Sequence, residues 1–183
     1  MTMKRRAFLK AAPAAGLVLV SGAAHATTYF TGDAIKRALF PGATRFVDRS
    51  FALSKPQVTI IAKASATRVM TPKVVAFDAY GGSMKLGTLL IDKVYGKHEF
   101  ITYALAINAG GSVKGVEVME YRESYGEQIR IPKWRAQFLG KRPGEALRID
   151  KEIKNISGAT LSCVHITEGV RRLLATYGLA LNA

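Results

Sequence analysis

The chain has 183 residues, 49% of them hydrophobic, and a formal net charge of +14, which suits one domain with one hydrophobic core. A charge of that sign attracts phosphates, anionic lipid or an acidic protein, without choosing among them. The single cysteine, Cys163, excludes an internal disulfide, so the core must be held together by burial.

The first 26 residues have the anatomy of a secretory signal. A basic cluster at 4–10 resembles the twin-arginine consensus, and an apolar run at 11–20 and the triplet Ala-His-Ala follow it. The apolar run is shorter than the roughly 20 residues of a membrane-spanning helix, and Pro13 interrupts it, so an uncleaved anchor is the weaker alternative. We predict export by the twin-arginine route, cleavage after Ala26 and a periplasmic protein.

Cleavage would leave residues 27–183 as one domain, without an internal repeat or long linker. The signal contains four cations and no acid, so its removal lowers the formal charge from +14 to +10. We expect no nucleic-acid partner, because the chain is exported and shows no recognisable reading helix or zinc finger. No metal site is expected either, since His98 and His165 have no Cys, Asp or Glu at metal-ligand spacing.

The domain is expected to begin with a short helix at 32–40, which a Pro-Gly pair ends. The middle of the chain then becomes rich in β-branched and aromatic residues punctuated by glycines. We predict strands of a mainly antiparallel sheet at residues 57–63, 73–80, 86–96, 99–109 and 113–122. The alternation is clearest at Ile101, Tyr103, Leu105 and Ile107, which we expect on one face of the sheet.

Two further helices complete the prediction. The segment KWRAQFLG is a short helix with Trp134 and Phe138 on one face. The last helix runs from about 162 to 177, and we expect Arg171 and Arg172 on its solvated side. A sheet from the middle of the chain with N-terminal, short middle and C-terminal helices indicates a single α+β domain.

The segment NISGATLS lies where the last helix begins. A helix N-terminus exposes unpaired N–H groups and the positive end of the macrodipole, so a phosphate binds well there. Gly158 and Ala159 would keep the approach open, and Ser157, Thr160 and Ser162 add hydroxyls that cap a helix or donate to phosphate oxygen. This chemistry describes a phosphate cradle, although no P-loop sequence precedes it. The alternative is that Ser157 to Thr160 are an ordinary helix cap after a tight turn. Ser162 itself is expected to be the N-cap of the helix.

The same residues resemble the flavinylation motif of the FMN-binding domain family, which occurs in peripheral subunits of sodium-translocating quinone reductases and of ferredoxin-dependent complexes. In that family, the Thr of Ser-Gly-Ala-Thr is esterified by the phosphate of FMN, and a separate flavin transferase uses FAD as donor. Thr160 is the matching residue. Upstream, YRESYGEQI resembles the family's Glu-Thr-x-Gly segment, with Glu123, Ser124 and Gly126 in the corresponding places. The resemblance covers residues 100–178.

The resemblance implies a set of cofactor-binding residues, with no catalytic residue and no metal ligand. These are Glu123, Ser124, Gly126, Trp134, Ser157, Gly158, Ala159, Thr160, Leu161 and Ser162. Trp134 is included as a wall of the isoalloxazine site, and Ser162 is the alternative ester site. The chain departs from the family at Lys154, where an Asp is common; a cation there alters recognition by the transferase or favours the bound phosphate. Cys163 is read as a packed, inert thiol rather than an activated one.

The implied function is that of a periplasmic electron-transfer flavoprotein with FMN esterified to Thr160. Its implied partners are the flavin transferase and a membrane or periplasmic redox protein. Such a protein is an electron carrier or a component of a redox complex rather than a stand-alone enzyme. Two alternatives stay open: a non-redox sensor or adaptor that binds FMN or another phosphate ligand reversibly, and a basic docking subunit without a cofactor.

Overall fold

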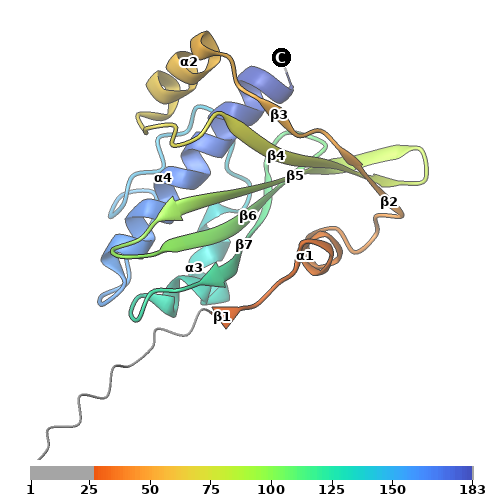
Figure 1. Cartoon of the computed structure of the whole chain (residues 1–183). Coiled ribbons are helices and arrows are strands. Elements are labelled where there is room, and N and C mark those ends of the chain that lie inside the picture. The colour runs from red at the N-terminus through yellow and green to blue at the C-terminus, as the bar shows by residue number, and fades with distance from the viewer. Residues whose placement is uncertain (1–26, 183) are drawn as a thin grey trace, which may run out of the picture.

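A computed structural model describes residues 27–182, so the predicted signal and its cleavage site lie outside the described residues. The described chain is an α+β domain in which helices lie on both faces of a curled antiparallel sheet (Figure 1). The predicted fold class is confirmed. Within residues 27–182, no helix is both long enough and apolar enough to cross a membrane.

All strand pairs in the sheet are antiparallel, in the order β1-β7-β6-β5-β4-β2, with β3 also paired to β4. The strands are β1 Thr27–Thr28, β2 Arg45–Asp48, β3 Phe51–Ala52, β4 Lys73–Gly81, β5 Met84–Tyr95, β6 Phe100–Asn108 and β7 Val113–Tyr121. The four long strands, β4 to β7, are those predicted from the β-branched segments. The three short strands were not predicted, because two to four residues carry no readable alternation.

The prediction of a strand at 57–63 was wrong. The segment belongs to helix α2, Lys55–Ser65. Its start is a capping box: the Ser54 hydroxyl accepts from the N–H of Gln57, and the Gln57 side chain accepts from the N–H of Ser54 at 2.9 Å. This local signal and the packing of Ile61 against the core outweigh the strand preference of the β-branched residues.

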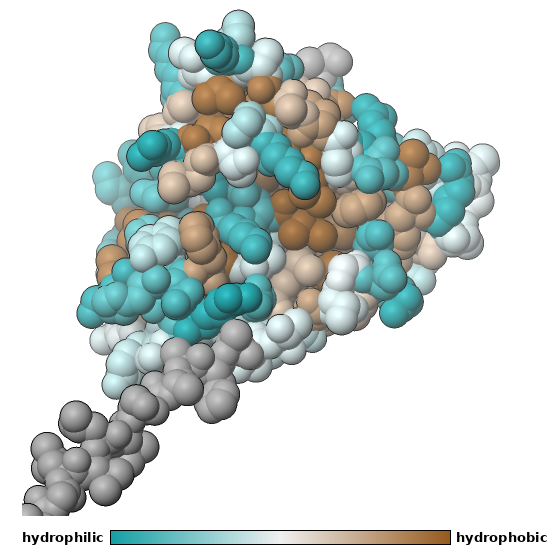
Figure 2. Space-filling view, viewed as in Figure 1, coloured by the Kyte–Doolittle hydropathy of each residue, from teal (hydrophilic) through white to brown (hydrophobic). Residues whose placement is uncertain are grey.

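The other helices lie near the ends of the chain and between β7 and the last helix. They are α1 Gly32–Leu39, α3 Pro132–Arg135, α4 Thr160–Thr176 and the short helical turns Glu127–Arg130, Ala136–Phe138 and Tyr177–Leu181. Helix α4 lies along one face of the sheet and α1 lies on the other (Figure 1). The short α1 covers its face of the sheet only in part. Figure 2 shows apolar residues gathered in the middle of this face.

Strand β6 separates two apolar clusters. Ile101, Tyr103, Leu105 and Ile107 are fully buried on the side of α4, as the alternation predicted. Alanines on the opposite face of β6 pack with residues of α1. Both faces of the central strand are therefore buried, which fixes its register and the position of the strands beside it.

The prediction that Arg171 and Arg172 face solvent was wrong. Arg172 is only 6% exposed, and its guanidinium donates to the carboxylate of Asp92 at 2.6 Å. The Tyr103 hydroxyl donates to the same carboxylate at 3.3 Å. Arg171 donates to the carbonyl oxygens of Ser65 and of the loop before α4. Helical spacing identifies the face toward the sheet, but α2 also packs on α4 and buries its flank.

Candidate cofactor site

The two sequence motifs meet in one pocket of about 310 Å³, at the start of α4. The pocket is lined by Lys97, Glu123, Tyr125, Gly126, Gly158, Ala159, Thr160, Leu161 and Ser162. Its volume is within the range of small-molecule sites. The fold thus brings together most of the predicted residues, although Ser124, Ser157 and Trp134 do not line the pocket.

A tight turn delivers the chain into α4. The N–H of Ala159 donates to the carbonyl of Ile156 at 3.0 Å, and Gly158 has φ of 85° at the third position of the turn. That φ favours glycine, so Gly158 is required by the backbone as well as by open access. Ala159 is the N-cap and is 3% exposed, which limits it to a small side chain. The prediction of Ser162 as the N-cap was wrong, because the helix begins at Thr160, two residues before the predicted 162.

The first turn of α4 has exposed donors. Ala159 offers no side-chain cap, so the N–H groups of Thr160, Leu161 and Ser162 lack both a cap and an intrahelical acceptor. Thr160 is exposed, and its hydroxyl oxygen lies 3.3 Å from the side-chain nitrogen of Asn155, which the sequence did not identify as a site residue. Leu161 is 47% exposed beside it. This turn can therefore hold an anion beside an exposed hydroxyl.

Gly126 and Ser162 join the two motifs at the back of the pocket. A Cβ on Gly126 would clash with Ser162 Oγ and lie 2.7 Å from the Tyr121 hydroxyl. Gly126 also has φ of 98°, so a side chain there is both strained and crowded. The Tyr121 hydroxyl donates to the carbonyl of Tyr125, so Ser162 donates to Tyr121 across 3.0 Å. The glycine of the upstream motif is needed for this close packing.

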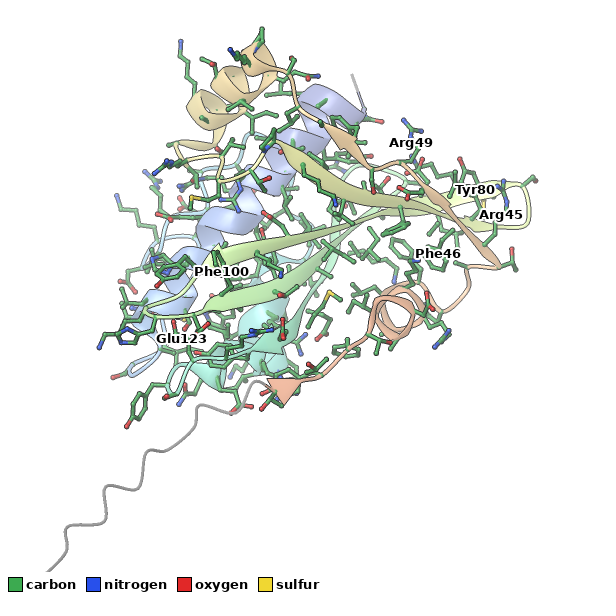
Figure 3. All side chains as sticks on the ribbon, in the orientation of Figure 1. Arg45, Phe46, Arg49, Tyr80, Phe100 and Glu123 are labelled. Atoms are coloured by element: carbon green, nitrogen blue, oxygen red, sulfur yellow. The ribbon has the colours of Figure 1, made fainter. Side chains whose placement is uncertain are left out.

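Glu123 supports the third segment of the pocket. Its carboxylate accepts from the N–H groups of His98 at 2.6 Å and Glu99 at 2.9 Å, in the turn between β5 and β6. Figure 3 shows Glu123 at this end of the sheet, near Phe100. Burial raises the pKa of Glu123, but the backbone donors outweigh that effect and hold the pKa below its usual value. Glu123 thereby fixes the turn that carries Lys97, a lining residue that no sequence motif identified.

Trp134 is not a wall of this pocket, contrary to our expectation. It is 4% exposed, its indole N–H donates to the carbonyl of Lys154 at 2.8 Å, and its ring packs edge-on against Phe138. The aromatic residue in the lining is Tyr125, which is 86% exposed. Its position inside the Glu-Ser-x-Gly segment was a signal that could have identified it.

Among the described residues, neither a reactive thiol nor a metal-binding cluster is found at this pocket. Cys163 is fully buried, and burial raises the pKa of its thiol, which fits the inert reading. Across residues 27–182, no three His, Cys, Asp or Glu side chains are grouped to hold a metal ion. The chemistry of the pocket is that of an exposed hydroxyl, helix N–H donors, a cation and an aromatic ring.

Comparison with known families identifies the domain. Residues 96–175 match the model of the FMN-binding domain, and every residue that lines the pocket falls within this range. These residues belong to the FMN-binding domain family. No curated protein matches the chain significantly. The crystal structure of NqrC from Shewanella oneidensis is similar in fold, with a TM-score of 0.51 and 15% identity over 84% of this chain and 76% of that chain.

The residues of the pocket fit the cofactor that the family name gives. The open N-terminus of α4 suits a phosphate, Lys97 adds a positive charge, and exposed Tyr125 and Leu161 offer surface to a flat ring system. FMN is therefore the cofactor of this FMN-binding domain. When bound, FMN would supply one- and two-electron chemistry at this pocket.

Proposed function

We propose that the protein is a periplasmic electron-transfer flavoprotein whose FMN is held by a phosphoester bond to Thr160. The observation that carries the proposal is the contrast between the two hydroxyls that line the pocket from α4. Thr160 is exposed at the first position of the helix, whereas Ser162 is 5% exposed and bonded to Tyr121. A flavin transferase that brings FAD to the domain can reach the first hydroxyl and not the second.

A covalent link suits a carrier outside the cytoplasm. Binding at micromolar affinity corresponds to about 8 kcal/mol, and a cofactor lost from such a site is not readily replaced in the periplasm. A short tether keeps the released ring at an effective concentration of about millimolar. Retention of FMN then no longer depends on the affinity of this open pocket.

The redox partner that we propose is a membrane or periplasmic protein. The fold shared with NqrC supports this assignment, as does the position of the pocket at the end of the sheet. Tyr125 and Leu161 stand exposed at the pocket, so a bound flavin would be reachable from outside. The domain would carry electrons between proteins rather than reduce a substrate enclosed within it.

Intact-protein mass spectrometry tests the proposal directly. The mature chain, produced in a periplasm that contains the flavin transferase, should carry the mass of one FMN minus one water, on a peptide that contains Thr160. Thr160→Ala should remove this mass, whereas Ser162→Ala should keep it. An unmodified wild-type chain would refute the ester, and a mature protein that still begins with Met1 would refute the predicted cleavage after Ala26.

A reversible FMN-binding module is the second candidate, and Lys154 favours it because the family commonly has Asp there. Denaturation followed by filtration separates the two functions, since a reversible ligand passes the membrane and an ester stays with the protein. In a reversible module, restoring the acid with Lys154→Asp would be the change to try for gaining the ester.

A further inference from the structure

We infer that Asn155 is a positioning residue that presents the Thr160 hydroxyl for flavin transfer, an inference that rests on the proposed ester at Thr160. Asn155 is half-buried, and its side-chain nitrogen lies 3.3 Å from Thr160 Oγ1. The two residues stand on either side of the turn that leads into α4. The hydrogen bond therefore closes this turn across its open side.

The orientation of the amide is fixed by a second hydrogen bond. The N–H of Ile156 donates to Asn155 Oδ1 at 2.8 Å, so this oxygen is the acceptor end of the side chain. An amide is planar, and its NH2 group must then point away from Ile156. Thr160 lies on that side, so Asn155 donates to the threonine oxygen, and exchanging the two ends of the amide would lose the bond from Ile156.

The segment that carries Asn155 is itself anchored. The N–H of Lys154 donates to the Gln137 side chain at 2.7 Å, and the carbonyl of Lys154 accepts from the buried Trp134. On the other side, the turn is closed by the bond between Ala159 and Ile156. The backbone that carries Asn155 is therefore held in place. Trp134 contributes to the site by binding the Lys154 carbonyl rather than by contacting a flavin ring.

The chemistry of the transfer explains why a donor at this place is useful. Thr160 Oγ1 forms a bond to the phosphorus of the FMN half of FAD, and the pyrophosphate bond breaks so that AMP leaves with the bridging oxygen. The hydroxyl proton passes to a base of the transferase. A donor from Asn155 occupies one lone pair and fixes the rotamer, while the O–H and the second lone pair remain available. Such orientation removes freedom that the reaction would otherwise have to restrict.

The test compares variants of the mature apo protein with purified transferase and FAD, and follows the FMN ester by intact mass over time. Asn155→Ala should lower kcat about tenfold, as expected for one lost hydrogen bond, with KM for the apo protein unchanged. Asn155→Asp should also be slow, because a carboxylate cannot donate a hydrogen bond to the Thr160 oxygen and would accept one from the hydroxyl instead. Lys151→Ala is the control in the loop before α4, because this exposed side chain does not line the pocket, and it should react at the wild-type rate.

A measurement on the apo protein reads the positioning without any flavin. Three-bond NMR couplings to the Thr160 methyl group should report one rotamer in the wild type and averaged rotamers in Asn155→Ala, with the thermal midpoint unchanged. A wild-type rate for Asn155→Ala, an effect confined to KM, or unchanged couplings would overturn the inference. A wild-type protein that forms no ester would instead remove the proposed function, and this inference with it.

Discussion

The two ends of helix α4 treat their polar groups in opposite ways. The first turn, at Thr160, has an exposed hydroxyl and three backbone N–H groups without a side-chain cap. About one turn before the end of the helix, Arg172 is buried and paired with Asp92, which also accepts from the hydroxyl of Tyr103. One helix therefore presents an exposed hydroxyl at one end and is bonded to the sheet at the other.

This difference separates residues that support the fold from residues that support the site. A buried charge that loses its partner remains desolvated, so substitutions at Arg172 should act on stability. An exposed hydroxyl is solvated in both the folded and the unfolded chain. Substitutions at Thr160 should therefore affect the proposed attachment of FMN rather than stability. Variants at Arg172 should change the free energy of unfolding, whereas variants at Thr160 should change the yield of the proposed FMN ester.

The largest expected effect is at the anchored end. Arg172→Met should lower the free energy of unfolding by about 3 kcal/mol, because the half-buried Asp92 is left beside Tyr103 without its cation. Urea denaturation at neutral pH measures the loss. Arg122→Ala removes an ion pair with Glu120 at the surface and should change stability far less. Equal losses in the two variants would show that α4 is not anchored through Arg172.

The two motif glycines should differ in a second comparison. Gly126→Ala should cost about 3 kcal/mol, because the new methyl group combines a strained φ with a clash against Ser162 and Tyr121. Gly158→Ala should cost about 1 kcal/mol, since φ is 85° but nothing lies within 4 Å of the added carbon. Urea denaturation of both variants checks the order. A larger loss at Gly158 would contradict the packing described at the back of the pocket.

The long elements of the fold could be read from the sequence because burial produces a period. Ile101, Tyr103, Leu105 and Ile107 alternate on a strand with one face against α4, and their prediction was confirmed. The same reasoning failed at 57–63, where β-branched residues lie in a helix set by the cap at Ser54. It also failed at Arg172, because helical spacing does not reveal that a cation on the buried face is paired with Asp92 of β5.

The site was predictable only where a motif exists. The motifs point to Glu123, Gly126 and Thr160 by residue type, and the fold places them on one pocket. No motif pointed to Lys97, which lines the pocket, or to Asn155, which contacts Thr160. Such contacts depend on the backbone geometry of short turns, and the spacing of apolar residues in the sequence does not reveal that geometry.

A smaller pair of effects is expected within the reactive turn itself. Ser162→Ala should destabilise the protein by about 1 kcal/mol, because it leaves the buried Tyr121 oxygen without a donor. Thr160→Ala should change the free energy of unfolding by no more than about 0.5 kcal/mol, since the side chain is exposed. Denaturation of the apo proteins compares them. A clear loss for Thr160→Ala would mean that this hydroxyl has a structural role.

The smallest effect is a pH dependence at Glu123. Its pKa in the folded protein lies below the ordinary value of 4.5, so the carboxylate stabilises the fold fully above that value. The contribution is lost as the pH falls below 4.5 and through the folded pKa. Glu123→Gln keeps the size of the side chain but cannot titrate. The stability difference between wild type and Glu123→Gln should therefore be largest at neutral pH and shrink toward pH 3. A difference that stays constant over this range would show that the backbone donors of His98 and Glu99 do not hold the ionised carboxylate.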